Sequence, residues 1–242
     1  MSKPIIRFCA DAADLARAAA EHFVALAGRT VATRGQFTVA LAGGSTPRAA
    51  YALLARDEFA ARVDWLRVHV FWGDERCVPP DHPDSNYRMA RETLLDHVPI
   101  PTDNIHRIQG ELNPDQAASI YQDELQAVLG TGERFDLILL GMGVDGHTAS
   151  LFPGTTALEE RERAVVAVYV EKMQRWRVTL TLPIINAARH VLFLVSGDAK
   201  AGVLAQINAG VRLPASLVQP SHGELTWLVD QNAASNLIES PI

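Results

Sequence analysis

The sequence predicts a doubly wound α/β fold, with a mostly parallel sheet, right-handed crossovers and helices on both faces of the sheet. Short apolar or β-branched segments alternate with longer segments that have helical spacing. Glycine-rich or charged stretches follow four of the apolar segments directly. The 242 residues contain no repeat, low-complexity tract or long linker, so we expect a single domain over residues 1–242.

The expected strands are short and have the composition of buried strands in a parallel sheet. We expect such strands at residues 37–41, 66–72, 135–140 and 190–196, with two more at 164–170 and 177–182 and a last strand at 225–230.

The expected helices carry recognisable start signals. Residues 11–28 have apolar residues at helical spacing, and Asp11 is available as the N-cap. A second helix can begin at Ser85. A third opens with Asn113 as N-cap and Pro114 at its first position, and a fourth covers residues 198–207.

Composition and charge limit the possible partners. The net charge of −6 argues against general nucleic-acid binding, so an anionic ligand must be held by a local group of donors. No apolar run approaches the roughly 18 to 20 residues of a membrane span. The N-terminus has no signal-peptide core, and two cysteines do not make a disulfide framework. We therefore expect a cytoplasmic protein.

The stretch "LAGGSTPRAAYALL" has the features of an anion site at a helix N-terminus. Gly43 and Gly44 let the backbone turn, Ser45 or Thr46 can cap the next helix, and Pro47 suits its first turn. Free N–H groups and the helix dipole at such a turn attract anions. An ordinary capped turn explains the same residues. Neither the GxxxxGK[ST] nor the GxGxxG pattern occurs, so a single phosphate on a small molecule fits best.

Two cations are candidates to accompany this turn. Lys200 lies in the first turn of an expected helix, where a cation opposes the helix dipole and a bound anion would remove the conflict. A solvated lysine is an equally simple explanation. Arg177, at the start of an expected strand, is a weaker second candidate.

The stretches "GDER" and "GMGVDGHTASLFPG" supply candidate catalytic groups. Asp74 and Arg76 directly follow one strand, although an isolated charged triplet is more often a solvated loop. His147 has the side chain whose ordinary pKa suits a general base near neutral pH, and Asp145 could orient it.

Three glycines of the second stretch could let the backbone approach a substrate: Gly141, Gly143 and Gly146. Recognised metal-ligand spacings and the GxSxG motif are absent from the sequence, so we expect no metal site and no serine triad.

These stretches together resemble the 6-phosphogluconolactonase family, from about Phe37 to Leu204. Two longer segments also resemble this family: "VHVFWGDERCVPPDHPDSNYRMARETLL", which contains "GDER", and "RVTLTLPIINAARHVLFLVSGDAKAGVL". The resemblance implies the modified Rossmann-like fold shared with glucosamine-6-phosphate deaminase and ribose-5-phosphate isomerase. It also implies hydrolysis of 6-phospho-D-glucono-1,5-lactone to 6-phospho-D-gluconate in the oxidative pentose phosphate pathway, with no cofactor.

The resemblance also implies roles for single residues. His147 matches the general base that activates water, and Asp145 would support it. Arg76 matches an arginine that stabilises developing negative charge, and Asp74 would line the same pocket. The phosphate-binding positions would be Gly43, Gly44, Ser45, Thr46, Lys200 and Arg177.

Two other functions are alternatives for the same set of residues. Deaminases have a segment that resembles "DEY" at the position where this chain has Asp74, Glu75 and Arg76. They also carry a glutamate shortly after the histidine, near the position of Phe152. Sugar-phosphate sensor domains share the fold, but they are normally joined to a helix-turn-helix. The sequence favours the lactonase, with a small sugar-phosphate lactone as ligand, no nucleic-acid or membrane partner, and a monomer or weak homodimer.

Overall fold

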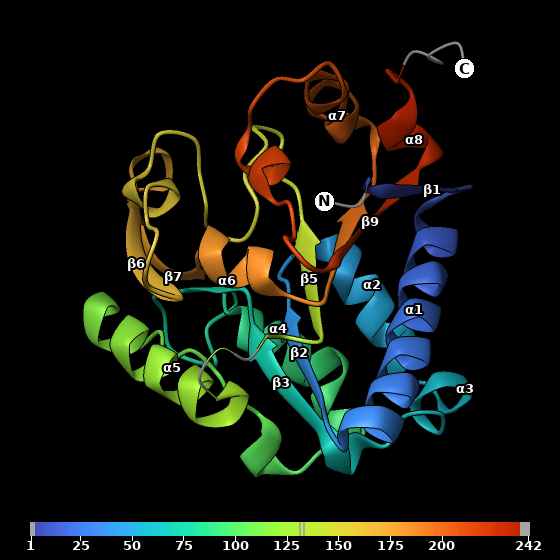
Figure 1. Cartoon of the computed structure of the whole chain (residues 1–242), viewed down its shortest axis with the longest axis vertical. Coiled ribbons are helices and arrows are strands. Elements are labelled where there is room, and N and C mark those ends of the chain that lie inside the picture. Colours follow the sequence, from blue (N-terminus) through green and yellow to red (C-terminus); the bar gives the residue numbers. More distant parts are fainter. Residues whose placement is uncertain (1–2, 131, 133, 238–242) are drawn as a thin grey trace.

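The computed structural model describes residues 3–130, 132 and 134–237, and Figure 1 shows their arrangement. Within this part of the chain, the central sheet has six strands in the order β1-β9-β8-β5-β2-β3, and all neighbouring pairs are parallel. The parallel α/β prediction is therefore confirmed. The strands are β1 (Ile5–Cys9), β2 (Phe37–Leu41), β3 (Val68–Trp72), β5 (Leu137–Gly141), β8 (His190–Val195) and β9 (Glu224–Asp230).

A second sheet of three antiparallel strands lies beside the first one. It consists of β4 (Asp74–Arg76), β7 (Arg175–Leu180) and β6 (Val165–Val170), in that order. The prediction that segments 164–170 and 177–182 add parallel strands is wrong. Only residues 171–174 separate β6 from β7, and a parallel pair needs a crossover of about a dozen residues.

Three helices begin where the sequence indicates. Asp11 accepts hydrogen bonds from the N–H groups of residues 13 and 14, Ser85 accepts one from residue 88, and Asn113 accepts from residues 115 and 116. These three N-caps are confirmed. The helices are α1 (Ala12–Arg34), α2 (Ser45–Leu54), α3 (Asp57–Ala60), α4 (Asn86–Thr93), α5 (Pro114–Leu129), α6 (Leu182–Ala187), α7 (Ala201–Asn208) and α8 (Gln231–Ala234).

Two strands were missed by the sequence analysis. β1 is an edge strand, and its first four side chains are exposed, so it lacks the pattern of a buried strand. β4 consists of three charged residues, although Asp74 and Glu75 are buried. Charged residues in a strand need specific partners, and the sequence pattern does not show those partners.

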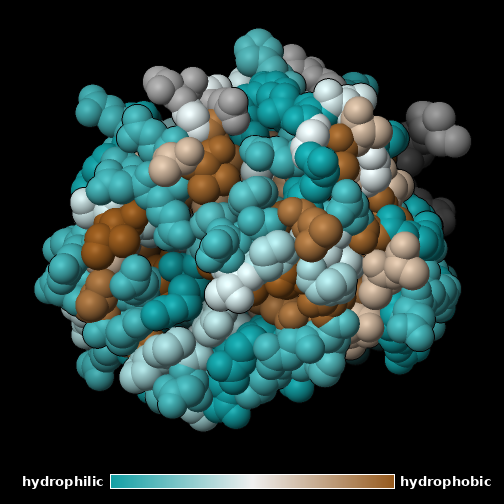
Figure 2. Space-filling view, turned by 90° about the horizontal axis from the view of Figure 1, so that it is seen from below, coloured by the Kyte–Doolittle hydropathy of each residue, from teal (hydrophilic) through white to brown (hydrophobic). Residues whose placement is uncertain are grey.

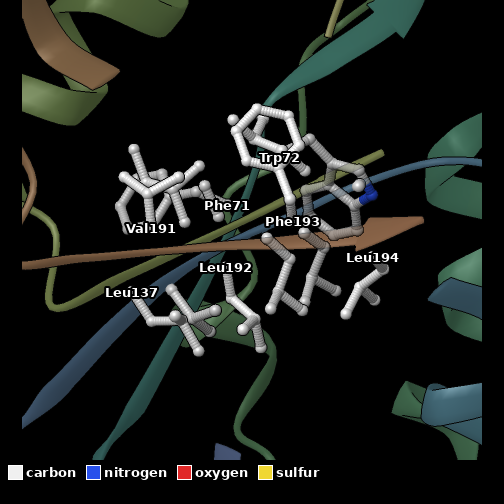
Figure 3. Packing of buried hydrophobic residues seen from close by; sticks show 14 of the residues in the cluster. Phe71, Trp72, Leu137, Val191, Leu192, Phe193 and Leu194 are labelled. Carbon is white, nitrogen blue, oxygen red and sulfur yellow. The ribbon is translucent and has the colours of Figure 1, made fainter. Parts of the chain in front are cut away.

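The core is formed by large side chains from neighbouring strands. Phe71 of β3, Leu137 of β5 and Phe193 of β8 are fully buried. Figure 3 shows Phe71 and Phe193 on one side of the strands and Leu137 on the other, so the sheet is packed on both faces. Phe193 also stacks on Trp227 of β9, with ring centroids 3.9 Å apart. This packing fixes the relative positions of the strands whose ends carry the candidate site.

On the face of the molecule in Figure 2, hydrophobic residues occur in separate patches. Seen from below, hydrophilic residues lie between these patches (Figure 2). In the described part of the chain, no helix combines the length and apolar character needed to cross a membrane.

Gly73 joins the two sheets and thereby positions the candidate site. Its N–H donates to the carbonyl oxygen of Leu41 at the end of β2, and its own carbonyl oxygen accepts from the N–H of Leu180 at the end of β7. The carboxyl ends of β2, β5 and β8 are neighbours in the first sheet. The second sheet is therefore held against the edge where ligands bind in parallel α/β folds.

Candidate active site

A cleft of about 280 Å³ lies at the carboxyl ends of these strands, between the two sheets. Nine of the ten predicted site residues line it, and Asp145 contacts the cleft residue His147. The nine are Gly43, Gly44, Ser45, Thr46, Asp74, Arg76, His147, Arg177 and Lys200. Residues from five separate stretches of the sequence are thus brought to one place.

The N-terminus of α2 forms one wall of the cleft. The prediction that Ser45 or Thr46 caps this helix is wrong, because the helix already begins at Ser45 and Gly44 is its N-cap. Gly44 has φ of 102°, a conformation that favours glycine. No described side chain caps the helix. The first N–H groups of α2 are therefore available to an anion, which the helix dipole also attracts.

Asn86 is a cleft residue that the sequence analysis missed. A Cβ atom at Gly43 would lie 2.0 Å from Asn86 Oδ1, so only glycine leaves room for this side chain. The Asn86 amide donates to the carbonyl oxygen and to Oδ1 of Asp74, at 2.9 and 3.2 Å. The sequence feature that could have drawn attention to Asn86 is its position directly after the predicted N-cap Ser85.

Asp74 is held by partners on both of its carboxylate oxygens. Oδ1 accepts from Asn86, and Oδ2 accepts from the Ser150 hydroxyl at 2.5 Å. Nη1 of Arg177 lies 3.6 Å from Oδ2. The carboxylate is buried, and these contacts compensate its loss of hydration. Asp74 therefore ties together three different segments around the cleft.

Glu75 serves the fold beneath the site. Its carboxylate accepts from the Ser85 hydroxyl and from the backbone N–H groups of Arg76, Asn86 and Tyr87. Burial raises the pKa of Glu75, and the backbone hydrogen bonds oppose that shift. An acceptor at the N-terminus of α4 stabilises the helix and fixes the start of the segment that carries Asn86.

Arg76 and Arg177 lie directly opposite each other on β4 and β7. Nη1 of Arg76 donates to the carbonyl oxygen of Asp84 at 2.6 Å, and Nη2 of Arg177 contacts Met173 Sδ at 3.0 Å. Among the described residues, the buried Nε atoms of both arginines lack a hydrogen-bond partner. Burial lowers the pKa of Arg177, and Asp74 opposes that shift. The pair presents donors that suit a negatively charged ligand.

His147 is held by Asp145 through one ring nitrogen. Nδ1 lies 2.5 Å from Asp145 Oδ1, and Lys172 Nζ lies 3.5 Å from Oδ2. Burial raises the pKa of Asp145, but the hydrogen bonds it accepts and the charge interaction with His147 together outweigh burial, and the pKa falls below its ordinary value. The ionised carboxylate only accepts, so Nδ1 carries the proton and Nε2 is left as the basic nitrogen.

Two of the three glycines in the segment that carries His147 make room for protein side chains. A Cβ atom at Gly143 would lie 2.0 Å from His147 Nδ1. Gly146 has φ of 76°, and a Cβ atom there would lie 2.7 Å from Leu213. A Cβ atom at Gly141 would meet nothing within 4 Å. Gly143 is thus the glycine on which the position of the imidazole depends.

Lys200 reaches the cleft from the residue directly before α7. A 3-10 turn, Asp198–Lys200, precedes the helix, so the lysine lies slightly ahead of the predicted first turn. Burial lowers the pKa of its ammonium group, and Asp145 opposes the shift. Among the described residues, no group of three or more His, Cys, Asp or Glu side chains is arranged to hold a metal ion.

Residues 10–227 match the family model described as glucosamine-6-phosphate isomerases/6-phosphogluconolactonase. The chain belongs to this family. Among its family relatives, a 6-phosphogluconolactonase from Synechocystis is 48% identical over 218 residues, which cover 86% of this chain and 88% of the relative. One from Haemophilus influenzae is 40% identical, over 81% of this chain and 85% of the relative.

Solved structures of family members have the same fold. The 6-phosphogluconolactonase from Trypanosoma cruzi superposes with a TM-score of 0.87 and 35% identity, over 98% of each chain. A monomeric glucosamine-6-phosphate deaminase gives a TM-score of 0.81 at 22% identity, over 96% of this chain and 99% of the other. At that level of identity, the deaminase shares the fold and nothing more can be transferred from it.

Proposed function

We propose that this family member hydrolyses 6-phospho-D-glucono-1,5-lactone to 6-phospho-D-gluconate, a reaction of the oxidative pentose phosphate pathway. The observation that carries the proposal is the Asp145–His147 pair, which holds a basic nitrogen in the same cleft as an uncapped helix N-terminus and three cations. The relatives named 6-phosphogluconolactonase support it.

The phosphate group would bind at the N-terminus of α2. Gly43, Gly44, Ser45 and Thr46 form that end of the cleft, and a dianion there gains from the free N–H groups and from the dipole. Lys200 adds a positive charge in the same cleft. Binding at this end leaves the lactone ring near the second sheet and the histidine.

The chemistry would follow from the free nitrogen of His147. Nε2 removes a proton from water while the water oxygen bonds to lactone C1, and the carbonyl electrons move to its oxygen. Arg76 or Arg177 stabilises this oxyanion with guanidinium N–H groups. Collapse of the intermediate breaks the bond from C1 to the ring oxygen. The imidazolium returns its proton to that oxygen, which leaves an open-chain hydroxyl and a carboxylic acid that ionises.

The deaminase alternative is less well supported by the residues. The position near which deaminases carry a glutamate holds Phe152, which has no group able to transfer a proton. Arg76 gives a cation where the deaminase pattern has a tyrosine. We include a cytoplasmic location and a monomeric or weakly dimeric state in the lactonase proposal.

The test is the loss of freshly prepared lactone near neutral pH, with EDTA present and the spontaneous rate subtracted. The wild type should accelerate it, and His147→Ala should lower kcat by about 100-fold or more, with a small change in KM. The matched control is His222→Ala, because the side chain of His222 is exposed and does not line the cleft. An inactive wild type would exclude the function, whereas an active His147→Ala variant would exclude the assignment of the base.

A further inference from the structure

Phe152 lies against the imidazole of His147. The two rings are stacked, with centroids 4.0 Å apart and an interplanar angle of 22°. The Cζ atom of Arg177 lies 5.8 Å from the centroid of the Phe152 ring, within the range of a cation–π contact. Phe152 therefore contacts the candidate base and one of the candidate cations at the same time.

The loop after His147 turns back and brings Phe152 to this position. The N–H of Leu151 donates to the carbonyl oxygen of Thr148 at 2.9 Å, and the same two residues form an isolated antiparallel bridge. Ala149 inside the turn has φ of 47°, which is unusual for a residue with a side chain. A tight turn of this kind places residue 152 beside residue 147.

Phe152 is buried, and it is not one of the residues that line the described cleft. It can therefore act on a bound substrate only through its neighbours. The hydrogen bond from Nδ1 to Asp145 fixes one atom of the imidazole, but the χ2 torsion of histidine has a broad energy well. A flat ring packed on the face of the imidazole narrows that well, because rotation about χ2 would drive the edge of the imidazole into it.

We propose that Phe152 is a positioning residue that holds the plane of the His147 ring, so that Nε2 stays directed into the cleft. This inference rests on the proposed function for its kinetic test. The fixed orientation of the imidazole is a structural statement, and it can be tested without measuring the reaction.

The kinetic test replaces the flat ring and keeps the apolar volume. Phe152→Leu should lower kcat by about 10- to 100-fold, because a displacement of about 1 Å has effects of that size, and KM should stay within about threefold. Phe152→Tyr keeps the stacked ring and should retain most of the turnover; Phe152→Met is the second flexible variant. The matched control is Phe59→Leu. Phe59 is fully buried and lies near two arginines, Arg17 and Arg62, outside the cleft.

A second readout follows the imidazole itself. The ¹⁵N shifts of the His147 ring, assigned by comparison with His147→Gln, should show Nδ1 protonated and Nε2 unprotonated in the wild type. In Phe152→Leu the two shifts should approach each other, because an imidazole that leaves the hydrogen bond to Asp145 part of the time exchanges between its two tautomers. Unchanged shifts, or wild-type kcat in Phe152→Leu, would overturn the inference. A wild type without lactonase activity would remove the proposed function, and the ¹⁵N comparison would still decide the role of Phe152.

Discussion

Replacement of Gly143 by alanine should disable the site and leave the fold intact. The Cβ atom would lie 2.0 Å from Nδ1 and 2.1 Å from Cε1 of His147, and 2.8 Å from Oδ1 of Asp145. The backbone φ of Gly143 is not in the left-handed region, so alanine itself adopts the conformation without strain. The side chain that must move is the imidazole.

The size of the effect follows from the distance. Nonbonded heavy atoms are best separated by about 3.5 Å, so the imidazole must shift by about 1.5 Å. A shift of about 1 Å in a catalytic group costs about 100-fold in rate, which corresponds to about 2.7 kcal/mol in the activation free energy. We therefore expect kcat to fall by about 100-fold or more. The phosphate end of the cleft is unchanged, so KM should stay within about threefold.

The matched control is Gly141→Ala, at the last residue of β5. Gly141 also lines the cleft and has an ordinary φ, but a Cβ atom there would meet nothing within 4 Å. Both variants and the wild type would be compared by lactone loss and by thermal unfolding. Wild-type kcat in Gly143→Ala would refute the assignment of His147 as base. An equal loss in Gly141→Ala would show that the distance argument is wrong.

Further predictions concern binding, geometry and stability. Lys200→Met should raise KM by about 10- to 100-fold with little change in kcat, because it removes a charged hydrogen-bond donor; steady-state kinetics would test this. Since burial lowers the pKa of Lys200, binding of 6-phosphogluconate should weaken as the pH rises toward that pKa in calorimetric titrations, and Lys200→Met should lack this fall. Gly43→Ala should lower kcat/KM by about tenfold or more, because the new Cβ displaces Asn86 from Asp74; unchanged kinetics would contradict it. Asp136→Ala should lower the unfolding free energy by about 2 to 3 kcal/mol in urea titrations at unchanged kcat, because its buried carboxylate accepts from the N–H and hydroxyl of Thr38.

The sequence predicted the parts of the fold that depend on local patterns. Five of the six described strands of the parallel sheet follow from composition, and the N-caps at Asp11, Ser85 and Asn113 follow from side-chain hydrogen bonding within a few residues. The direction of β6 and β7 was wrong because apolar composition indicates burial but does not identify the neighbouring strand. β4 was missed since its carboxylates are satisfied by residues that follow about ten positions later, such as Ser85 and Asn86.

The candidate site was predicted as a set of residues, but its internal contacts were not. Ligands of parallel α/β sheets bind beyond the carboxyl ends of the strands, and this rule predicted that residues after β2, β5 and β8 meet at one edge. These residues do line one cleft. The opposition of Arg76 and Arg177 depends on the register of an antiparallel pair that the sequence does not specify. The contact of Gly143 with the imidazole requires the tertiary path of the loop.

The contacts of the two carboxylates indicate which group can act as the base. Both oxygens of Asp74 accept hydrogen bonds, from Asn86 and Ser150, and Arg177 lies beside them. Proton transfer to Asp74 would break one of these contacts inside a buried network, which is costly. Oδ1 of Asp145 accepts the hydrogen bond from Nδ1 of His147, so proton transfer to this oxygen would also break a contact. A proton taken up at Nε2 of His147 breaks no hydrogen bond to a described residue, and it places a positive charge beside the ionised Asp145. Of the three groups, we therefore propose His147 as the one that gains and returns a proton within a single turnover.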